Sequence, residues 1–252
     1  MIHILLSRWR QGHRTMAYPK TLPALPDRFR GRPEFGPGAC SEGCSACAQA
    51  CPTGAIGLAP LSLDLGRCLF CTECMDACPD GVIRFTGDHR LAARNRDDLV
   101  QGPGDPLKRA EALGRELMRV LGRSLKLRVV SAGGCNGCEV DVNVLGTLAW
   151  DLGRFGIQFV ASPRHADGLI VCGPVTTAMA LALRKTYDAV PDPKLVIAVG
   201  ACAIGGGPYL EQAEQLGGVA AAGLPVDLFV PGCPPHPLTL LDGLLGLLGK
   251  IQ

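Results

Sequence analysis

The sequence predicts two domains of different architecture: an α+β module over residues 37–88, followed by a doubly wound α/β domain over residues 126–252. Three observations lead to this fold class. Eight of the thirteen cysteines fall within residues 40–78, where one pattern occurs twice. After residue 125, short apolar segments alternate with helical ones, as in a parallel sheet covered on both faces. Finally, 252 residues with 47% hydrophobic side chains suffice for two cores.

The composition also excludes several classes of protein. A net charge of +2 and 5% aromatic residues argue against nucleic-acid binding. An odd number of cysteines in a chain of this length does not fit a secreted disulfide framework. Without a long apolar run or a signal-peptide pattern, we expect a cytoplasmic protein, whose clustered cysteines bind metal more often than they form disulfides.

The first 36 residues are expected to form a basic, proline-rich arm. Residues 1–39 carry seven Arg or Lys and two acidic residues, a net charge of +5, whereas residues 40–252 have a net charge of −3. Four apolar residues at the start of the arm have helical spacing: Ile2, Leu5, Leu6 and Trp9. This spacing predicts a short amphipathic helix at a membrane surface or against a partner, with a frayed end as the alternative. The stretch from Pro19 to Pro37 predicts an extended segment lying over another part of the protein.

An internal repeat organises the module. Residues 44–56 match residues 71–83 at a constant offset, and each copy contains C-x-x-C-x-x-x-C-P. The second half, which begins at Cys68, has the spacing of bacterial [4Fe–4S] sites, in which three thiolates on one loop reach one cluster and the fourth ligates the other. Repeated sequence implies repeated structure, here two halves related by a pseudo-two-fold axis.

Two [4Fe–4S] clusters follow from this pattern. The ligands expected for one cluster are Cys68, Cys71, Cys74 and Cys51. Those expected for the other are Cys40, Cys44, Cys47 and Cys78. The spacing between Cys40 and Cys44 is one residue longer than in the pattern, and we expect Gly43 to absorb the insertion. A zinc-stabilised scaffold is the alternative, although zinc requires neither the Cys-Pro ending nor the crossed repeat.

Residues 89–125 are expected to link the two domains. The polar stretch 87–104 predicts a connection, and residues 105–125 predict a helix with Asp105 as its cap and Pro106 in its first turn. The strands predicted in the α/β domain are Lys126–Ser131, Ile157–Ala161, Gly168–Cys172, Leu195–Val199 and Val226–Val230. The helices predicted there are Thr176–Val190 and Leu238–Leu248.

The five remaining cysteines lie at or just beyond the carboxyl ends of these strands. In a doubly wound sheet that edge binds ligands, so residues far apart in sequence converge there. The Gly/Pro-rich loops predict a third [4Fe–4S] cluster with four ligands: Cys135, Cys138, Cys202 and Cys233. Cys172 has no preceding glycine loop, and we interpret it as a buried apolar residue.

These motifs carry a family resemblance. Residues 15–86 resemble a two-cluster bacterial ferredoxin with the arm Leu25–Arg32 that precedes it in complex I and in energy-converting hydrogenases. Residues 127–252 are similar to the cluster-bearing subunit that complex I shares with [NiFe] hydrogenases, where it is the small subunit. The resemblance implies a ferredoxin module joined to a flavodoxin-like domain. It also implies that Arg164 lies near the third cluster and that Glu139 relays protons. The alternative role for Glu139 is that of an acidic residue at a helix N-terminus, where it interacts favourably with the helix dipole.

The first loop of the α/β domain separates the two branches of the resemblance. Hydrogenase small subunits carry C-x-x-C there, as at Cys135–Cys138, whereas complex I subunits carry adjacent cysteines. The resemblance therefore implies an electron-transfer subunit of an energy-converting [NiFe] hydrogenase, peripherally bound at the cytoplasmic membrane. Its partners would be a large subunit of the [NiFe]-hydrogenase type or of the corresponding complex I type, membrane-arm subunits and a soluble ferredoxin or dehydrogenase donor. The alternative within this resemblance is a complex I-like quinone oxidoreductase.

Overall fold

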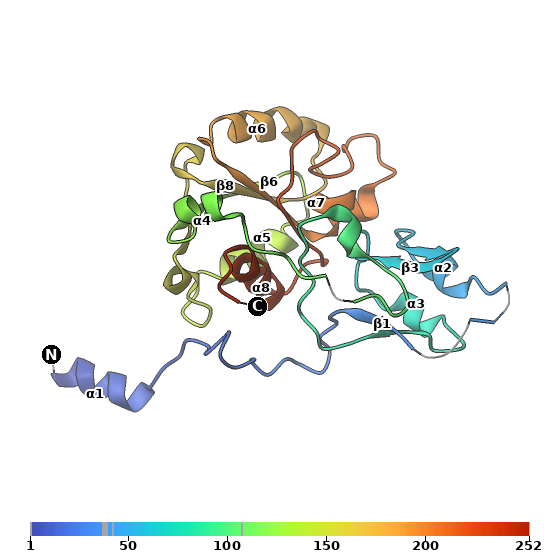
Figure 1. Ribbon diagram of the computed structural model, residues 1–252, viewed down its shortest axis with the longest axis horizontal. Helices are drawn as coiled ribbons and strands as arrows, with labels where there is room; N and C mark the ends of the chain where they lie inside the picture. Colours follow the sequence, from blue (N-terminus) through green and yellow to red (C-terminus); the bar gives the residue numbers. More distant parts are fainter. Residues whose placement is uncertain (1, 37–39, 42, 107, 252) are drawn as a thin grey trace.

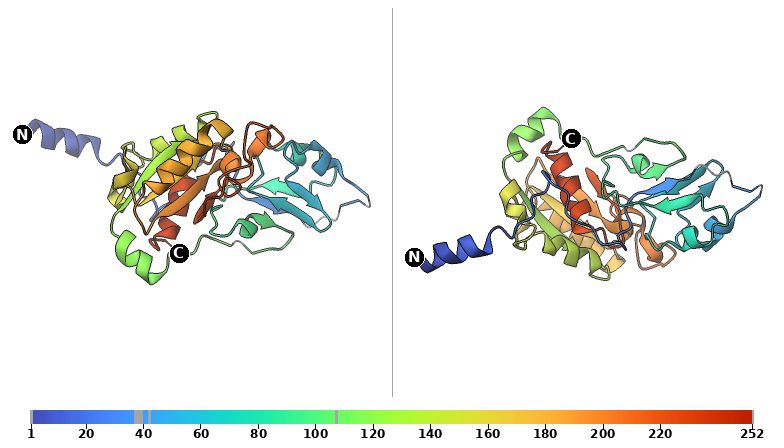
Figure 2. Two further views of the ribbon diagram at one scale, coloured as in Figure 1. Left: turned by 90° about the horizontal axis from the view of Figure 1, so that it is seen from above. Right: turned by 90° about the horizontal axis from the view of Figure 1, so that it is seen from below.

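The computed structural model describes residues 2–36, 40–41, 43–106 and 108–251 (Figure 1). An α/β domain occupies the centre of the molecule, and the cysteine-rich module lies at one side of it (Figure 2). Helix α1 (Ile2–Gln11) projects from the side of the α/β domain that faces away from the module.

The cysteine-rich module repeats in structure as it does in sequence. Its elements are β1 (Pro33–Phe35), α2 (Ala46–Ala50), β2 (Ile56–Leu58), β3 (Leu61–Asp64), α3 (Glu73–Asp76) and β4 (Ile83–Phe85). Helix α2 and strand β2 correspond to α3 and β4 at the offset of the sequence repeat. Strand β1 pairs antiparallel with β4, and β2 pairs antiparallel with β3. The two halves thus each provide a helix followed by a strand, as the repeat predicts.

The polar stretch 87–104 does more than connect the domains. It contains η1 (Arg96–Leu99) and β5 (Val100–Gln101), and β5 pairs antiparallel with β3 of the module. On the other side, Ala93 forms an antiparallel bridge with Phe229 of the α/β domain. This stretch is therefore hydrogen-bonded to both domains.

The helix predicted over residues 105–125 is much shorter in the structure, where α4 spans Arg115–Leu121. The preceding backbone makes tertiary hydrogen bonds instead, with Ala110 N–H donating to Ala92 and Leu113 N–H donating to Leu247. The carboxylate of Asp105 accepts from the Gly102 N–H at 2.6 Å, so it closes a turn and caps no helix. Long-range bonds override the local helical pattern here, while residue 107 lies outside the described residues.

The α/β domain contains a five-stranded parallel sheet. Its strands are β6 (Leu125–Ser131), β7 (Ile157–Phe159), β8 (Gly168–Cys172), β9 (Leu195–Val199) and β10 (Leu228–Val230). The spatial order β10-β9-β8-β6-β7 is, counted along the chain, the flavodoxin-like order 2-1-3-4-5. All five predicted strands are present, although β7 and β10 are shorter than expected.

Helices cover both faces of this sheet (Figure 1). They are α5 (Gly137–Val144), α6 (Thr177–Asp188), α7 (Gly200–Gly205) and α8 (Pro237–Leu247). Residues Ile170 and Cys172 of β8 belong to the core shared with α5 and α8. Leu169 and Val171 of the same strand belong to the other core, which continues through α6 and α7 into the cysteine-rich module. The alternation along one strand therefore ties the module to a single face of the sheet.

After α1, the basic arm lies along the α/β domain and then reaches the module, in agreement with the expectation that Pro19 to Pro37 lies over another part of the protein. Met16 N–H donates to the Ala149 carbonyl at 2.9 Å, and the Arg154 guanidinium donates to the carbonyls of Met16 and Tyr18. Further along, Gly31 N–H donates to the Thr86 carbonyl at 2.7 Å, just before β1 enters the module. The arm thereby joins the two domains.

A buried polar network holds the arm to α8. The Tyr18 hydroxyl donates to the Asp242 carboxylate at 2.7 Å, and the Arg109 guanidinium donates to the same carboxylate oxygen at 3.0 Å. His89 lies 3.4 Å from the Tyr18 hydroxyl. Burial, followed by the hydrogen bond to Asp242, raises the pKa of Tyr18, while burial lowers the pKa of His89. Tyr18 is therefore a neutral donor to a carboxylate that Arg109 neutralises.

Candidate iron–sulfur sites

Four cysteines converge at the carboxyl edge of the parallel sheet. Cys135 and Cys138 follow β6, Cys202 follows β9, and Cys233 follows β10. Burial raises the pKa of the Cys202 thiol to about 12, and the negative charges of Cys233 and Cys135 add to the rise. Burial also raises the pKa of Cys138, with the charges of Cys202, Glu139, Cys233 and Cys135 as further causes. The structure thus brings together the four residues predicted from strand ends.

Two glycines let the backbone approach the sulfurs of these cysteines closely. A Cβ on Gly200, whose φ is +88°, would lie 2.5 Å from Cys138 Sγ, and one on Gly207 would lie 2.7 Å from Cys202 Sγ. Only glycine permits both the left-handed backbone and this close approach to sulfur. Cys202 is buried, whereas Cys135 and Cys233 are exposed. The site therefore has one buried and one open side.

The second group of four cysteines lies in the module. Burial raises the pKa of Cys68 to about 12, with a further rise from the charges of Cys74, Cys51 and Cys71 and an opposing effect from the Phe70 N–H. Cys51, from the first half of the repeat, therefore stands with three cysteines from the second half. This is the crossed arrangement that the sequence predicts.

The remaining group shows the reciprocal crossing. Burial raises the pKa of Cys47, and the charges of Cys78, Cys40 and Cys44 act in the same direction. Cys40, whose spacing is unusual, is thus brought to its expected neighbours. Gly43 has a φ of +73°, and Cys44 N–H donates to the Ser41 carbonyl at 3.0 Å. A left-handed glycine in a tight turn accommodates the additional residue.

Backbone amides support these sulfurs at repeated positions. Ala55 N–H donates to Cys51 Sγ at 3.2 Å, and Val82 N–H donates to Cys78 Sγ at 3.3 Å, one repeat later along the chain. Such hydrogen bonds stabilise thiolates, and they tune the reduction potential of any cluster that the thiolates ligate. Two groups of four cysteines that exchange their fourth members fit the spacing of a two-cluster ferredoxin, whereas zinc needs no such crossing.

The three groups form a row. Among the charges that raise the pKa of Cys74, after burial and its own group, is that of Cys47 in the neighbouring group. Likewise, burial and the charge of Cys135 raise the pKa of Cys233, and so does the charge of Cys71 from the module. The group containing Cys68 therefore lies between the other two. Sequence alone did not establish this order.

Cys172 and Glu139 lie behind the third group. Cys172 is fully buried as the last residue of β8, in the apolar core below α5 and α8. This agrees with its interpretation as a buried apolar residue. Glu139 is 6% exposed in the first turn of α5, and its Oε1 has no hydrogen-bond partner within the described part of the chain. Arg164, by contrast, is exposed on η3 (Pro163–His165).

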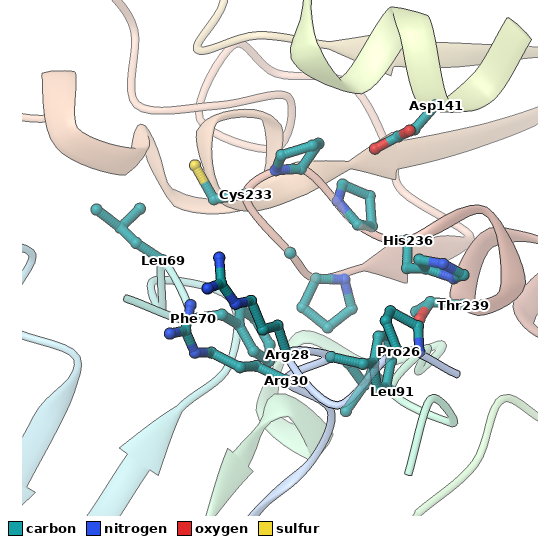
Figure 3. Close-up of a pocket in the computed structure, with 15 residues that line it drawn as sticks. Pro26, Arg28, Arg30, Leu69, Phe70, Leu91, Asp141, Cys233, His236 and Thr239 are labelled. Carbon is teal, nitrogen blue, oxygen red and sulfur yellow. The ribbon is translucent and has the colours of Figure 1, made fainter. Parts of the chain in front are cut away.

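A cavity of about 310 Å³ lies between the second and third groups (Figure 3). The arm lines one wall with Arg28 and Arg30, which reach toward Leu69 and Cys233. Sequence reasoning did not place these arginines near cysteines, although the basic character of the arm was a signal. His236 lines the cavity and caps α8, because its Nδ1 accepts from the Leu238 N–H at 3.1 Å.

The fold and the grouped cysteines define an iron–sulfur protein of the electron-transfer class. A family model described as the NADH ubiquinone oxidoreductase 20 kDa subunit matches residues 135–247, and a 4Fe-4S binding domain matches residues 61–84. A probable membrane-bound hydrogenase subunit of Pyrococcus furiosus is 42% identical over 144 residues, which are 57% of this chain and 86% of that protein. The chain therefore belongs to the NADH ubiquinone oxidoreductase 20 kDa subunit family and is an iron–sulfur subunit of an oxidoreductase complex.

Other relatives extend the comparison. An NADH-quinone oxidoreductase subunit of Bacteroides thetaiotaomicron is 44% identical over 116 residues, which are 46% of this chain and 58% of that protein. A chain in the structure of an archaeal membrane-bound sulfane sulfur reductase is 31% identical with a TM-score of 0.46, and the match covers 55% of this chain and 76% of that one. Among the helices of the described ranges, none has the length and apolar character needed to cross a membrane.

Proposed function

We propose that this chain relays electrons through three [4Fe–4S] clusters to or from a separate catalytic subunit of an energy-converting [NiFe] hydrogenase. The observation that carries the proposal is the set of three four-cysteine groups, in which the group containing Cys68 neighbours both others. The charge of Cys47 acts on Cys74, and Leu69 and Phe70, which follow Cys68, line one cavity together with Cys233. When bound, such clusters accept and donate single electrons. A row of three provides a path through the chain.

The residues of this chain would hold and separate the clusters. Twelve thiolates serve as ligands: Cys40, Cys44, Cys47 and Cys78; Cys51, Cys68, Cys71 and Cys74; Cys135, Cys138, Cys202 and Cys233. Burial raises the pKa of thiols such as Cys68 and Cys202, and these thiols must lose their protons when they bind iron. Cluster binding is therefore coupled to proton release from the buried cysteines. The core shared by the module and the sheet keeps the second and third groups at a fixed separation.

The two ends of the row suggest where partners bind. Cys40 is exposed at the outer end of the module, and Cys135 and Cys233 are exposed at the sheet edge. We propose that a soluble ferredoxin or dehydrogenase exchanges electrons at the module. The large subunit, of the [NiFe]-hydrogenase type or of the corresponding complex I type, would cover the third group, and membrane-arm subunits would hold the complex at the cytoplasmic membrane.

The first loop of the α/β domain favours the hydrogenase over the quinone oxidoreductase. Cys135 and Cys138 are spaced as C-x-x-C, and Asn136 between them has a φ of +71° before α5 begins at Gly137. This spacing is that of the hydrogenase branch of the resemblance. Relatives of both kinds match the chain, and the NADH-quinone oxidoreductase relative supports quinone reduction as the second candidate function.

An anaerobic preparation tests the proposal in two steps. The purified chain is expected to contain about twelve irons and twelve acid-labile sulfides, as three cubes require. Co-produced with its large subunit, it should then support hydrogen uptake with an artificial electron acceptor. Stoichiometric zinc without iron would overturn both relay functions. Quinone reduction without hydrogen uptake would establish the second candidate instead.

We also propose that Glu139 carries protons beside the third group. A buried carboxylate oxygen without a partner is costly unless it exchanges protons or meets a partner subunit. Glu139→Gln is expected to slow hydrogen uptake by about 100-fold, within the range of general acid–base effects, while iron content stays constant. The exposed Glu211→Gln variant is the control. Unchanged hydrogen uptake in Glu139→Gln would assign the carboxylate to the helix dipole.

A further inference from the structure

Helix α1 exposes an apolar surface that nothing in the described chain covers. None of its residues is buried. Five large apolar side chains are exposed: Ile2, Ile4, Leu5, Leu6 and Trp9. Trp9 is 82% exposed, an unusual position for the largest apolar side chain in water. Such a helix gains little from the rest of the fold, so its amphipathic pattern must be matched by another surface.

The pattern around the helix is that of an interfacial helix. At 100° per residue, four of the apolar side chains fall within an arc of about 100°: Ile2, Leu5, Leu6 and Trp9. Arg8 and Arg10 flank this arc on its two sides, where their charged ends can reach headgroups while their stems lie along the apolar surface. Ile4 falls on the opposite side, among polar residues.

The charge of the segment selects the kind of surface. The first acidic residue of the chain is Asp27, whereas four basic residues precede it: Arg8, Arg10, Arg14 and Lys20. A patch that is apolar in the middle and only basic around it complements a bilayer with anionic headgroups. It does not complement a purely apolar groove, in which the arginines would lose hydration without a partner.

The neighbouring surface continues this arrangement. Thr15 Oγ1 donates to the Leu148 carbonyl at 3.0 Å, which holds the end of the arm beside the loop after α5. Leu148 is 83% exposed in that loop. Tyr18 and Met16 anchor the next residues through Arg154, so α1 leaves the body at a defined place, on the side away from the module (Figure 2).

We propose that α1 lies in the plane of a bilayer interface that contains anionic phospholipids, with Leu5 and Trp9 inserted and Arg8 and Arg10 at the headgroups. The contact uses no cysteine, so it is independent of the proposed electron-transfer function. It would orient the α/β domain toward the membrane through Leu148 and leave the module on the distal side, open to a soluble partner.

Vesicle flotation with the full-length, iron-loaded chain tests the proposal. The wild type is expected to float with vesicles of phosphatidylglycerol and phosphatidylcholine at low salt. Leu5→Asp should weaken binding by about tenfold, because it removes an inserted side chain and adds a charge to the apolar arc. Ile4→Asp is the matched control, with the same charge added one residue away on the opposite face, and should change binding by less than about twofold.

The basic flanks are tested separately. Arg8→Gln with Arg10→Gln should reduce flotation with anionic vesicles and leave the small residual binding to pure phosphatidylcholine unchanged. Since no residue of α1 is buried, the visible absorbance of the clusters should be the same in every variant. Absence of flotation by the wild type would overturn the proposal and point to a protein partner for α1. Equal losses in Leu5→Asp and Ile4→Asp would overturn it as well.

Discussion

Cys202→Ala is expected to lower the iron content of the chain from about twelve to about eight per molecule, because it removes one ligand of the proposed third cluster. Cys202 lies in α7, where it is buried and packs against Gly207. None of the other described thiols occupies this position, so none can replace it. If the chain relays electrons as proposed, hydrogen uptake is lost completely, while the two clusters proposed for the module are retained. Iron and sulfide analysis, together with electron paramagnetic resonance of the reduced protein, measures both effects.

Cys172→Ala is the matched control for this variant. It removes a second buried thiol of the same domain, which lies near Cys138 and Glu139 but outside the group of four. We expect about twelve irons to remain, with a loss of stability of about 1 kcal/mol from the small cavity. Loss of four irons in Cys172→Ala, with none lost in Cys202→Ala, would exchange the roles of the two cysteines.

Asp242→Ala is expected to lower the free energy of unfolding by about 3 kcal/mol, which corresponds to a fall in the melting midpoint of roughly 6–12 °C. Asp242 is 5% exposed and accepts hydrogen bonds from both Tyr18 and Arg109. Its removal leaves the Arg109 guanidinium without its carboxylate and the Tyr18 hydroxyl with only the long contact to His89 at 3.4 Å. Leaving these buried groups poorly paired costs stability. Thermal unfolding of the iron-loaded chain, followed by circular dichroism, measures the change.

Two further variants serve as comparisons for Asp242→Ala. Tyr18→Phe removes only the arm's hydroxyl and should cost about 1 kcal/mol, with faster hydrogen exchange of the arm. Asp192→Ala removes a carboxylate that is 84% exposed beside Lys194 and should stay within about 0.5 kcal/mol of the wild type. If Asp242→Ala were as mild as Asp192→Ala, the network would not hold the arm to α8.

Local pattern was sufficient for the repeated module and for the strands. The sequence repeat reappears in the paired helices, strands and Sγ hydrogen bonds, because the same residues meet the same local constraints twice. Continuous apolar segments identified all five strands. The prediction of a helix over residues 105–125 was wrong in length because long-range contacts outweighed the local pattern. The backbone there forms hydrogen bonds with Ala92 and Leu247, which are distant in sequence. Helix α7 went unpredicted because its glycine-rich sequence resembles a loop.

By itself, the sequence predicted the number of cysteine groups, their membership and the architecture of the two domains, since these predictions depend on spacing and periodicity. Only the tertiary structure decided that the group of Cys68 lies between the others, that the arm brings Arg28 and Arg30 into the cavity beside Cys233, and that Asp242 fastens the arm to α8. These relations depend on how two separately patterned domains pack against one another. Packing joins residues as distant in sequence as Tyr18 and Asp242, and such pairs leave no periodic trace in a single sequence.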